Sequence, residues 1–122
     1  MSNQENHTTD TPIDIEFLMG IVENDAEFKR ELLEIFIESA QLNLNKLKDA
    51  ISTNDNNSWY MAAHAFKGAA TSIGAFNLSQ KLEHAQKHPE ENTDHKKKTL
   101  DAIEKDFNLA LDFINNTILA EK

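Results

Sequence analysis

The fold is decided by residues 59–74, whose sequence is WYMAAHAFKGAATSIG. Apolar side chains recur in this stretch at steps of three and four residues, the spacing that places them on one face of an α-helix. The members of that face are Trp59, Ala62, Ala63, Phe66, Ala69, Ala70 and Ile73. Most of them are small and permit close packing against a neighbouring helix, and Gly74 is typical of a helix end. The stretch therefore predicts a helix with one buried face.

Helical spacing continues on both sides of this stretch. It predicts a long helix over 25–52, a helix over 76–87 that Pro89 stops, and a last helix that starts at 92–94. The long helix has an apolar face made of Phe28, Leu32, Ile35, Phe36, Ala40, Leu44, Leu47 and Ile51. A short helix is expected from its cap at Thr11 to about Asn24, which could cap the long helix. We find no convincing alternation typical of strands, so the predicted fold class is all-α.

The connections between the predicted helices are only a few residues long, which favours antiparallel neighbours. We therefore expect an up-down-up-down four-helix bundle with the short additional N-terminal helix capping one end. Residues 1–11 are polar and are expected to form a flexible N-terminal segment, whereas residues 12–122 form the bundle domain. The apolar stripes can cover one another, so we expect a monomer. The Lys96-Lys97-Lys98 run is expected to lie on a solvated face.

Composition argues against several classes of protein. The chain has 122 residues, of which 21 are acidic and 12 basic, and its net charge of −9 argues against binding to nucleic acid. It has no cysteine, and its three scattered glycines cannot form a phosphate-binding loop. The apolar stretch 17–22 is too short for a membrane span, and residues 1–11 lack the pattern of a signal peptide. These features predict a soluble protein of the cytoplasm.

One histidine lies on the outward side of the helix over 59–74. At about 100° per residue, the apolar face is centred about 200° from His64, so the imidazole is expected to point away from the core. The outward side also carries Tyr60, Met61, Lys67, Gly68 and Thr71. Gly68 costs about 1 kcal/mol relative to alanine inside a helix, which suggests that another molecule approaches the ring closely there.

The surroundings of His64 are also free of acidic residues. No Asp or Glu occurs between Asp55 and Glu83, a stretch of 27 residues. Lys67 follows His64 by three residues and would offset the charge of an anionic group on the ring. Both features are physically suited to an anionic reaction centre at His64.

A resemblance to the histidine-containing phosphotransfer (HPt) domain family covers essentially the whole chain. The motif that carries it is Ala63-His64-Ala65-Phe66-Lys67-Gly68-Ala69-Ala70-Thr71-Ser72-Ile73-Gly74-Ala75, followed by Leu78 and Leu82-Glu83. The resemblance implies that His64 carries a phosphoryl group. It also implies that Lys67 and Gly68 occupy the lysine and glycine positions of the family, and that Gln86 on the following helix hydrogen-bonds the imidazole.

The resemblance further implies a phosphorelay intermediate, not an enzyme. His64 would take the phosphoryl group, through Nε2, from the aspartate of one receiver domain and pass it to the aspartate of another. The partners would be the receiver domains of a hybrid sensor kinase and of a response regulator. Mg²⁺ would be bound by the receiver, and this chain would need no cofactor. The alternative from another class is a non-catalytic helical interaction module that binds a signalling partner through the same surface.

A partner-binding surface is expected beside His64, on the side that carries Tyr60, Met61 and Thr71. The short first helix contains more apolar side chains than one short helix can bury, and Ile13 and Leu18 are expected to contribute to this surface. The alternative is that this helix simply caps the end of the bundle.

A metal site is a weaker possibility at the end of the helix over 76–87. His84 and His88 are four residues apart and could supply two ligands to a zinc ion. Two ligands do not make a site, so we expect a solvated helix end and no bound metal.

Overall fold

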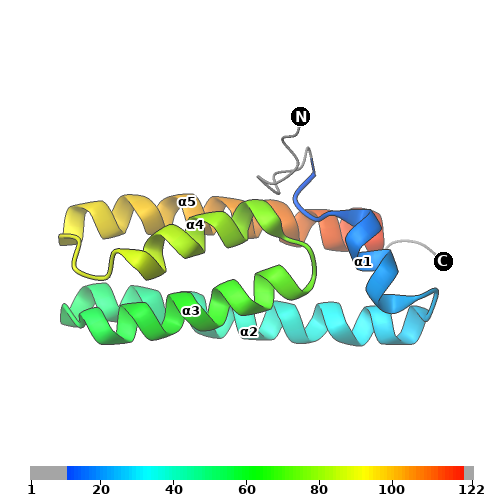
Figure 1. Cartoon of the computed structure of the whole chain (residues 1–122), viewed down its shortest axis with the longest axis horizontal. Helices are drawn as coiled ribbons and strands as arrows, with labels where there is room; N and C mark the ends of the chain where they lie inside the picture. The colour runs from blue at the N-terminus through cyan, green and yellow to red at the C-terminus, as the bar shows by residue number, and fades with distance from the viewer. Residues whose placement is uncertain (1–10, 120–122) are drawn as a thin grey trace.

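The computed structural model describes residues 11–119. Its elements are α1 (Ile15–Val22), α2 (Ala26–Thr53), α3 (Asn56–Ser72), α4 (Phe76–Lys87), α5 (Thr93–Phe113) and a π-helical turn, η2 (Ile114–Ile118), that continues α5. Helices α2 to α5 run up, down, up and down, and α1 lies across one end of the bundle (Figure 1). The prediction of an all-α four-helix bundle with a short N-terminal helix is confirmed. The segment predicted to be flexible, 1–11, lies outside the described residues except for Thr11.

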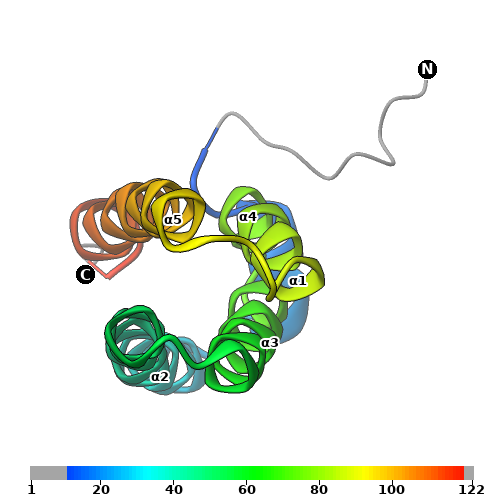
Figure 2. The ribbon, with the colours of Figure 1, turned by 90° about the vertical axis from the view of Figure 1, so that its left-hand side faces the viewer.

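The four long helices surround a common core, which is evident when the bundle is viewed along its axis (Figure 2). Large side chains that are fully buried include Leu33, Leu47, Trp59, Phe66, Leu82 and Ile103. Burial of each such side chain stabilises the fold by roughly 1.5–3 kcal/mol relative to leaving it exposed. The buried face predicted for α3 is confirmed, with Ala69 half-buried at its edge.

The apolar face predicted for α2 is wrong at two positions. Phe28 and Ile35 are exposed, whereas Leu33, which was not assigned to the buried face, is fully buried. The apolar residues of this helix cover a wider arc than the core can accept, because α3 and α5 contact only part of its circumference. Which residues remain outside depends on where these neighbouring helices sit.

Side-chain carboxylates begin three of the helices. Asp14, Asp25 and Asp55 each accept a hydrogen bond from the backbone N–H three residues later, at 2.9–3.1 Å. The predicted caps at Thr11 and Asn24 are therefore wrong by one to three residues. Asp14 lies three residues after Thr11 and Asp25 lies one residue after Asn24, and each carboxylate satisfies a free N–H group of the first helical turn.

The turn after α3 fixes the position of α1. Gly74 has a φ of +84°, and a Cβ atom at this position would lie 3.0 Å from Phe17 Cδ2 and 3.2 Å from the Asp14 carbonyl oxygen. The Asp14 N–H donates to the Gly74 carbonyl oxygen at 2.9 Å. Phe17 also packs edge-on against Phe76 at the start of α4, with ring centroids 5.1 Å apart. Gly74 therefore allows the chain to reverse and α1 to seat against the bundle.

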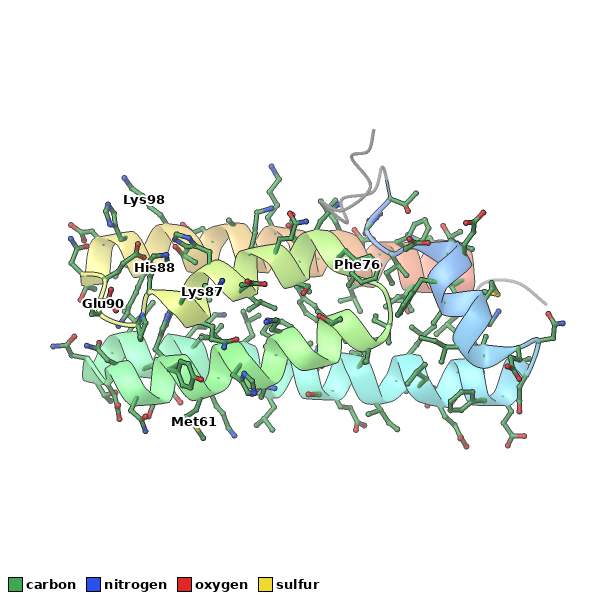
Figure 3. All side chains as sticks on the ribbon, in the orientation of Figure 1. Met61, Phe76, Lys87, His88, Glu90 and Lys98 are labelled. Atoms are coloured by element: carbon green, nitrogen blue, oxygen red, sulfur yellow. The ribbon has the colours of Figure 1, made fainter. Side chains whose placement is uncertain are left out.

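A buried tryptophan and a buried lysine hold the opposite end of the bundle together. Trp59 Nε1 donates to the Ala85 carbonyl oxygen at 3.0 Å, which joins α3 to α4. Lys96 of α5 is only 3% exposed, with its Nζ 5.3 Å from the Trp59 ring centroid and 2.6 Å from Asn56 Oδ1. The prediction of a solvated face is thus wrong for Lys96, whereas Lys98 points to solvent (Figure 3). Among residues 11–119, no helix is long and apolar enough to cross a membrane.

Candidate functional site

His64 is exposed on α3, on the side of the helix that faces away from the core. The neighbouring residues Ala63 and Phe66 on the opposite side are fully buried, and Ala70 continues that buried face one turn later. The rigid packing of this face fixes the direction in which the imidazole projects. The outward orientation predicted from helical spacing agrees with the structure.

The imidazole of His64 stacks on the ring of Tyr60, which lies one turn earlier on the same helix. The two ring centroids are 6.1 Å apart and the rings are nearly parallel, with an interplanar angle of 12°. Offset parallel stacking at this distance is a favourable arrangement of two aromatic rings. Tyr60 therefore contacts the imidazole directly, in addition to being part of the exposed surface around it.

Lys67 extends from α3 toward α4. Its Nζ lies 3.7 Å from Glu83 Oε1, and Lys87 Nζ lies 2.9 Å from Glu83 Oε2. The hydrogen bond from Lys87, followed by the charge of Lys67, lowers the pKa of the Glu83 carboxyl below its usual value. Sequence reasoning did not assign Glu83 to the site. The i,i+4 spacing of Glu83 and Lys87 signals their pairing, but the contact with Lys67 depends on how α3 packs against α4.

Gly68 lies one turn after His64, in the interior of α3. A Cβ atom at this position would meet no other atom within 4 Å, so neighbouring helices do not require the glycine. The backbone is helical, and no unusual φ requires it either. Gly68 instead leaves the helix surface bare beside the imidazole.

Gln86 lies on α4, directly after the residue whose carbonyl oxygen accepts the hydrogen bond from Trp59. Its Oε1 atom is buried and has no hydrogen-bond partner within the described part of the chain. The amide oxygen therefore makes no hydrogen bond to the imidazole in this structure. A buried acceptor without a donor is uncommon and costs about 1–3 kcal/mol, which marks this position as one that can accept a donor.

The comparison with protein-family models finds the Hpt domain over residues 31–111. The chain belongs to the Hpt domain family. A comparison with solved structures finds that this Hpt domain is similar to histidine-containing phosphotransfer protein B (HptB) from Pseudomonas aeruginosa PAO1, with a TM-score of 0.83 and 17% sequence identity. The alignment covers 93% of this chain and 100% of that chain, and at this identity it shows a shared fold. The comparison with curated proteins gives no match.

The structure separates the residues expected to bind a partner into two groups. Met61 is 59% exposed and points away from the bundle on α3 of this Hpt domain (Figure 3). Tyr60 and Thr71 are also exposed. Ile13 and Leu18 are fully buried, so the prediction that they contact a partner is wrong. They pack into the end of the bundle, as the alternative of a capping helix requires, and leave Phe17 and Ile21 on the outside of α1.

An open groove of about 510 Å³ runs between α2 and α3 of the Hpt domain. Met61, Ala62 and Ala65 line it from α3, and Asn43, Lys46 and Asp49 are among the residues that line it from α2. Two apolar side chains of α2, Ile35 and Leu42, lie nearby along that helix and are 63% and 56% exposed. Sequence analysis missed Leu42 and treated Ile35 as a core residue.

The histidines at the end of α4 lie close together. The ring centroids of His84 and His88 are 4.5 Å apart, and His84 Nε2 lies 3.6 Å from Glu91 Oε2. Within residues 11–119, no group of three or more His, Cys, Asp or Glu side chains is arranged to hold a metal ion.

Proposed function

We propose that His64 receives a phosphoryl group from the phospho-aspartate of one receiver domain and delivers it to the aspartate of another. Membership of the Hpt family supports a histidine phosphotransfer role in a phosphorelay. The observation that carries the assignment to His64 is an exposed imidazole on a rigid helix, beside a bare stretch of surface at Gly68. A globular domain can bring its phosphorylated side chain up to such a ring without colliding with α3.

In the proposed transfer, a lone pair on Nε2 attacks the phosphorus atom of the acyl phosphate. A new N–P bond forms, the bond between phosphorus and the aspartate oxygen breaks, and the carboxylate leaves with the electron pair. The proton on Nδ1 stays on the ring, whose positive charge then partly offsets the negative charge of the phosphoryl group. Transfer to the second receiver reverses these steps with a different carboxylate as the nucleophile.

Two side chains of this Hpt domain would assist that transfer. Lys67 is close enough to Glu83 to be held at the edge of α3, and its flexible side chain could turn toward a phosphoryl group on the imidazole. The Oε1 atom of Gln86 lacks a donor, and the Nδ1–H of a suitably turned imidazole would supply one. That hydrogen bond would leave Nε2 unprotonated, as its role as nucleophile requires.

The receiver would dock over the groove between α2 and α3. Met61 and two residues of α2, Ile35 and Leu42, are exposed apolar side chains that a docked receiver would bury on that side. Thr71 is also exposed on α3 and would lie at the contact. The receiver would contribute Mg²⁺ and the acidic residues that bind it, so this chain would act as a co-substrate. We propose that it does so as a monomer in the cytoplasm.

The test is phosphotransfer from receiver domains that have been loaded with acetyl phosphate in the presence of Mg²⁺. We expect the wild-type chain to acquire an acid-labile, alkali-stable phosphate, and His64→Gln to acquire none. His88→Gln is the matched control and should be labelled at the wild-type rate. Equal labelling of wild type and His64→Gln would exclude His64 as the acceptor. Tight receiver binding by both proteins without any labelling would instead support the non-catalytic interaction module.

A further inference from the structure

Tyr60 and Gly68 lie on opposite sides of His64 along α3, one turn before it and one turn after it. Side chains on an α-helix lean toward its N-terminus, which brings the imidazole over the turn that carries Tyr60. The near-parallel stacking of the two rings, with centroids 6.1 Å apart, is the result. On the Gly68 side, a Cβ atom would meet no atom within 4 Å beyond the neighbouring backbone of α3 itself.

The imidazole is therefore covered by the Tyr60 ring on one side, whereas the helix surface at Gly68 is open. Tyr60 is 37% exposed, so the stacked pair of rings lies at the surface of the bundle. Lys67 lies on the Gly68 side in the sequence, three residues after His64. The bare surface at Gly68 therefore leaves room for a partner beside the imidazole.

We propose that Tyr60 is a positioning residue, which fixes the plane of the His64 imidazole by stacking and thereby fixes the direction of the Nε2 lone pair, which lies in that plane. This inference rests on the proposed function of His64. An exposed histidine without a neighbouring ring samples several side-chain rotamers, and only part of that population points a nitrogen toward the donor. Stacking increases the population that is ready to react.

This role makes a different prediction from partner binding, which is the role that the sequence suggested for Tyr60. A positioning residue affects the rate of transfer within the assembled complex. A docking residue affects the receiver concentration at which that rate is reached. The two roles are therefore separated by measuring transfer from a receiver loaded with acetyl phosphate over a range of receiver concentrations.

We expect Tyr60→Ala to lower the limiting transfer rate by about three- to tenfold, the range that loss of one aromatic pair supports. The half-saturating receiver concentration should change by less than about twofold. Tyr60→Phe retains the ring and should transfer within about twofold of wild type. Leu109→Ala is the matched control, because Leu109 is also exposed but lies on α5. It should behave as the wild type does.

A spectroscopic measurement tests the stacking itself and needs no partner. The ring current of an aromatic neighbour displaces the NMR signals of the His64 Cδ2 and Cε1 protons. Wild type and Tyr60→Phe should share that displacement, and Tyr60→Ala should lose it. Histidine signals unchanged in Tyr60→Ala would overturn the inference, as would a change confined to the half-saturating concentration. Loss of the displacement with an unchanged limiting rate would also overturn it.

The control with His64→Gln separates this inference from the proposed function. If His64→Gln is labelled like wild type, the proposed function fails, and Tyr60 has no role in transfer. If His64→Gln is inert and Tyr60→Ala transfers normally, the proposed function stands and only the positioning role of Tyr60 is overturned.

Discussion

Lys67 Nζ lies 3.7 Å from Glu83 Oε1, so the lysine that follows His64 by three residues is paired with a carboxylate on α4. Glu83 also accepts a hydrogen bond from Lys87 at 2.9 Å. Because Lys87 remains as a partner, Glu83 keeps one counter-charge when Lys67 moves away. The ion pair therefore keeps Lys67 beside α4 and does not leave Glu83 without a counter-charge if Lys67 moves.

Glu83→Gln is expected to favour the phosphorylated form of the chain. Removal of the carboxylate frees Lys67 for the phosphoryl group and removes a nearby negative charge. Both groups are partly exposed, so we expect a shift of about two- to fivefold in the equilibrium between phospho-receiver and phospho-Hpt domain. Glu104→Gln breaks a similar surface pair, between Lys48 and Glu104, and should leave that equilibrium unchanged. An equal shift in both variants would show that net charge, not Lys67, is responsible.

Gly68→Ala should change stability and activity in opposite directions. The new Cβ atom meets no neighbour, and alanine is about 1 kcal/mol more favourable than glycine in a helix interior. The free energy of unfolding, measured by urea denaturation, should therefore rise by about that amount. Transfer from a receiver domain should slow, because the methyl group occupies the surface that the partner approaches. A variant that is stabilised and transfers at the wild-type rate would show that close approach at Gly68 is unnecessary.

Gln86→Met is also expected to slow phosphotransfer without lowering the stability of the fold. Methionine has a similar size and removes a buried acceptor that has no partner, so the free energy of unfolding should stay the same or rise by up to about 1 kcal/mol. The phosphotransfer rate should fall, because methionine could not accept the hydrogen bond proposed from Nδ1–H of the turned imidazole. Gln41→Met on the exposed surface of α2 is the control for a glutamine replaced elsewhere. Unchanged transfer by Gln86→Met would contradict the role given to the amide.

Lys96 should make the stability of the bundle depend on alkaline pH. Burial lowers the pKa of the Lys96 ammonium, while the nearby carboxylates of Glu90, Glu91 and Asp55 act in the opposite direction. The unfolded chain keeps this proton up to about pH 10.5, the usual lysine value, whereas the folded chain releases it at lower pH. The unfolded state therefore binds more protons in that interval, and the contribution of Lys96 to the free energy of unfolding rises with pH there.

Lys96→Met tests this assignment. Methionine keeps an apolar stem against the Trp59 ring and removes the titrating group. Urea denaturation of both proteins at several alkaline pH values should show a smaller rise, or a steeper fall, in the stability of Lys96→Met than of wild type. Parallel pH profiles would mean that the ammonium is not destabilised by burial in the folded chain.

Much of the site could be predicted from the geometry of a single helix. The direction of His64 depends only on the spacing of apolar residues around it on one helix, and a single helix has a fixed periodicity. The exposure of Gly68 follows from the same helical spacing. The bounds of α4 were also predicted correctly, because Pro89 interrupts the helical pattern after it. The caps were predicted less accurately: Thr11 and Asn24 were expected, whereas Asp14 and Asp25 cap the helices, because the choice among nearby polar residues depends on where the chain turns.

The amino-acid sequence by itself determined that the chain forms helices, which face of α3 is buried, and that one imidazole faces outward. These properties arise within one helix, where a residue's orientation follows from its number along the chain. Only the tertiary structure decided that Ile13, Leu18 and Lys96 are buried, that Ile35 is exposed, and that Lys67 meets Glu83. Each of those outcomes depends on the distance and rotation between separate helices, and the packing of all the side chains together sets them.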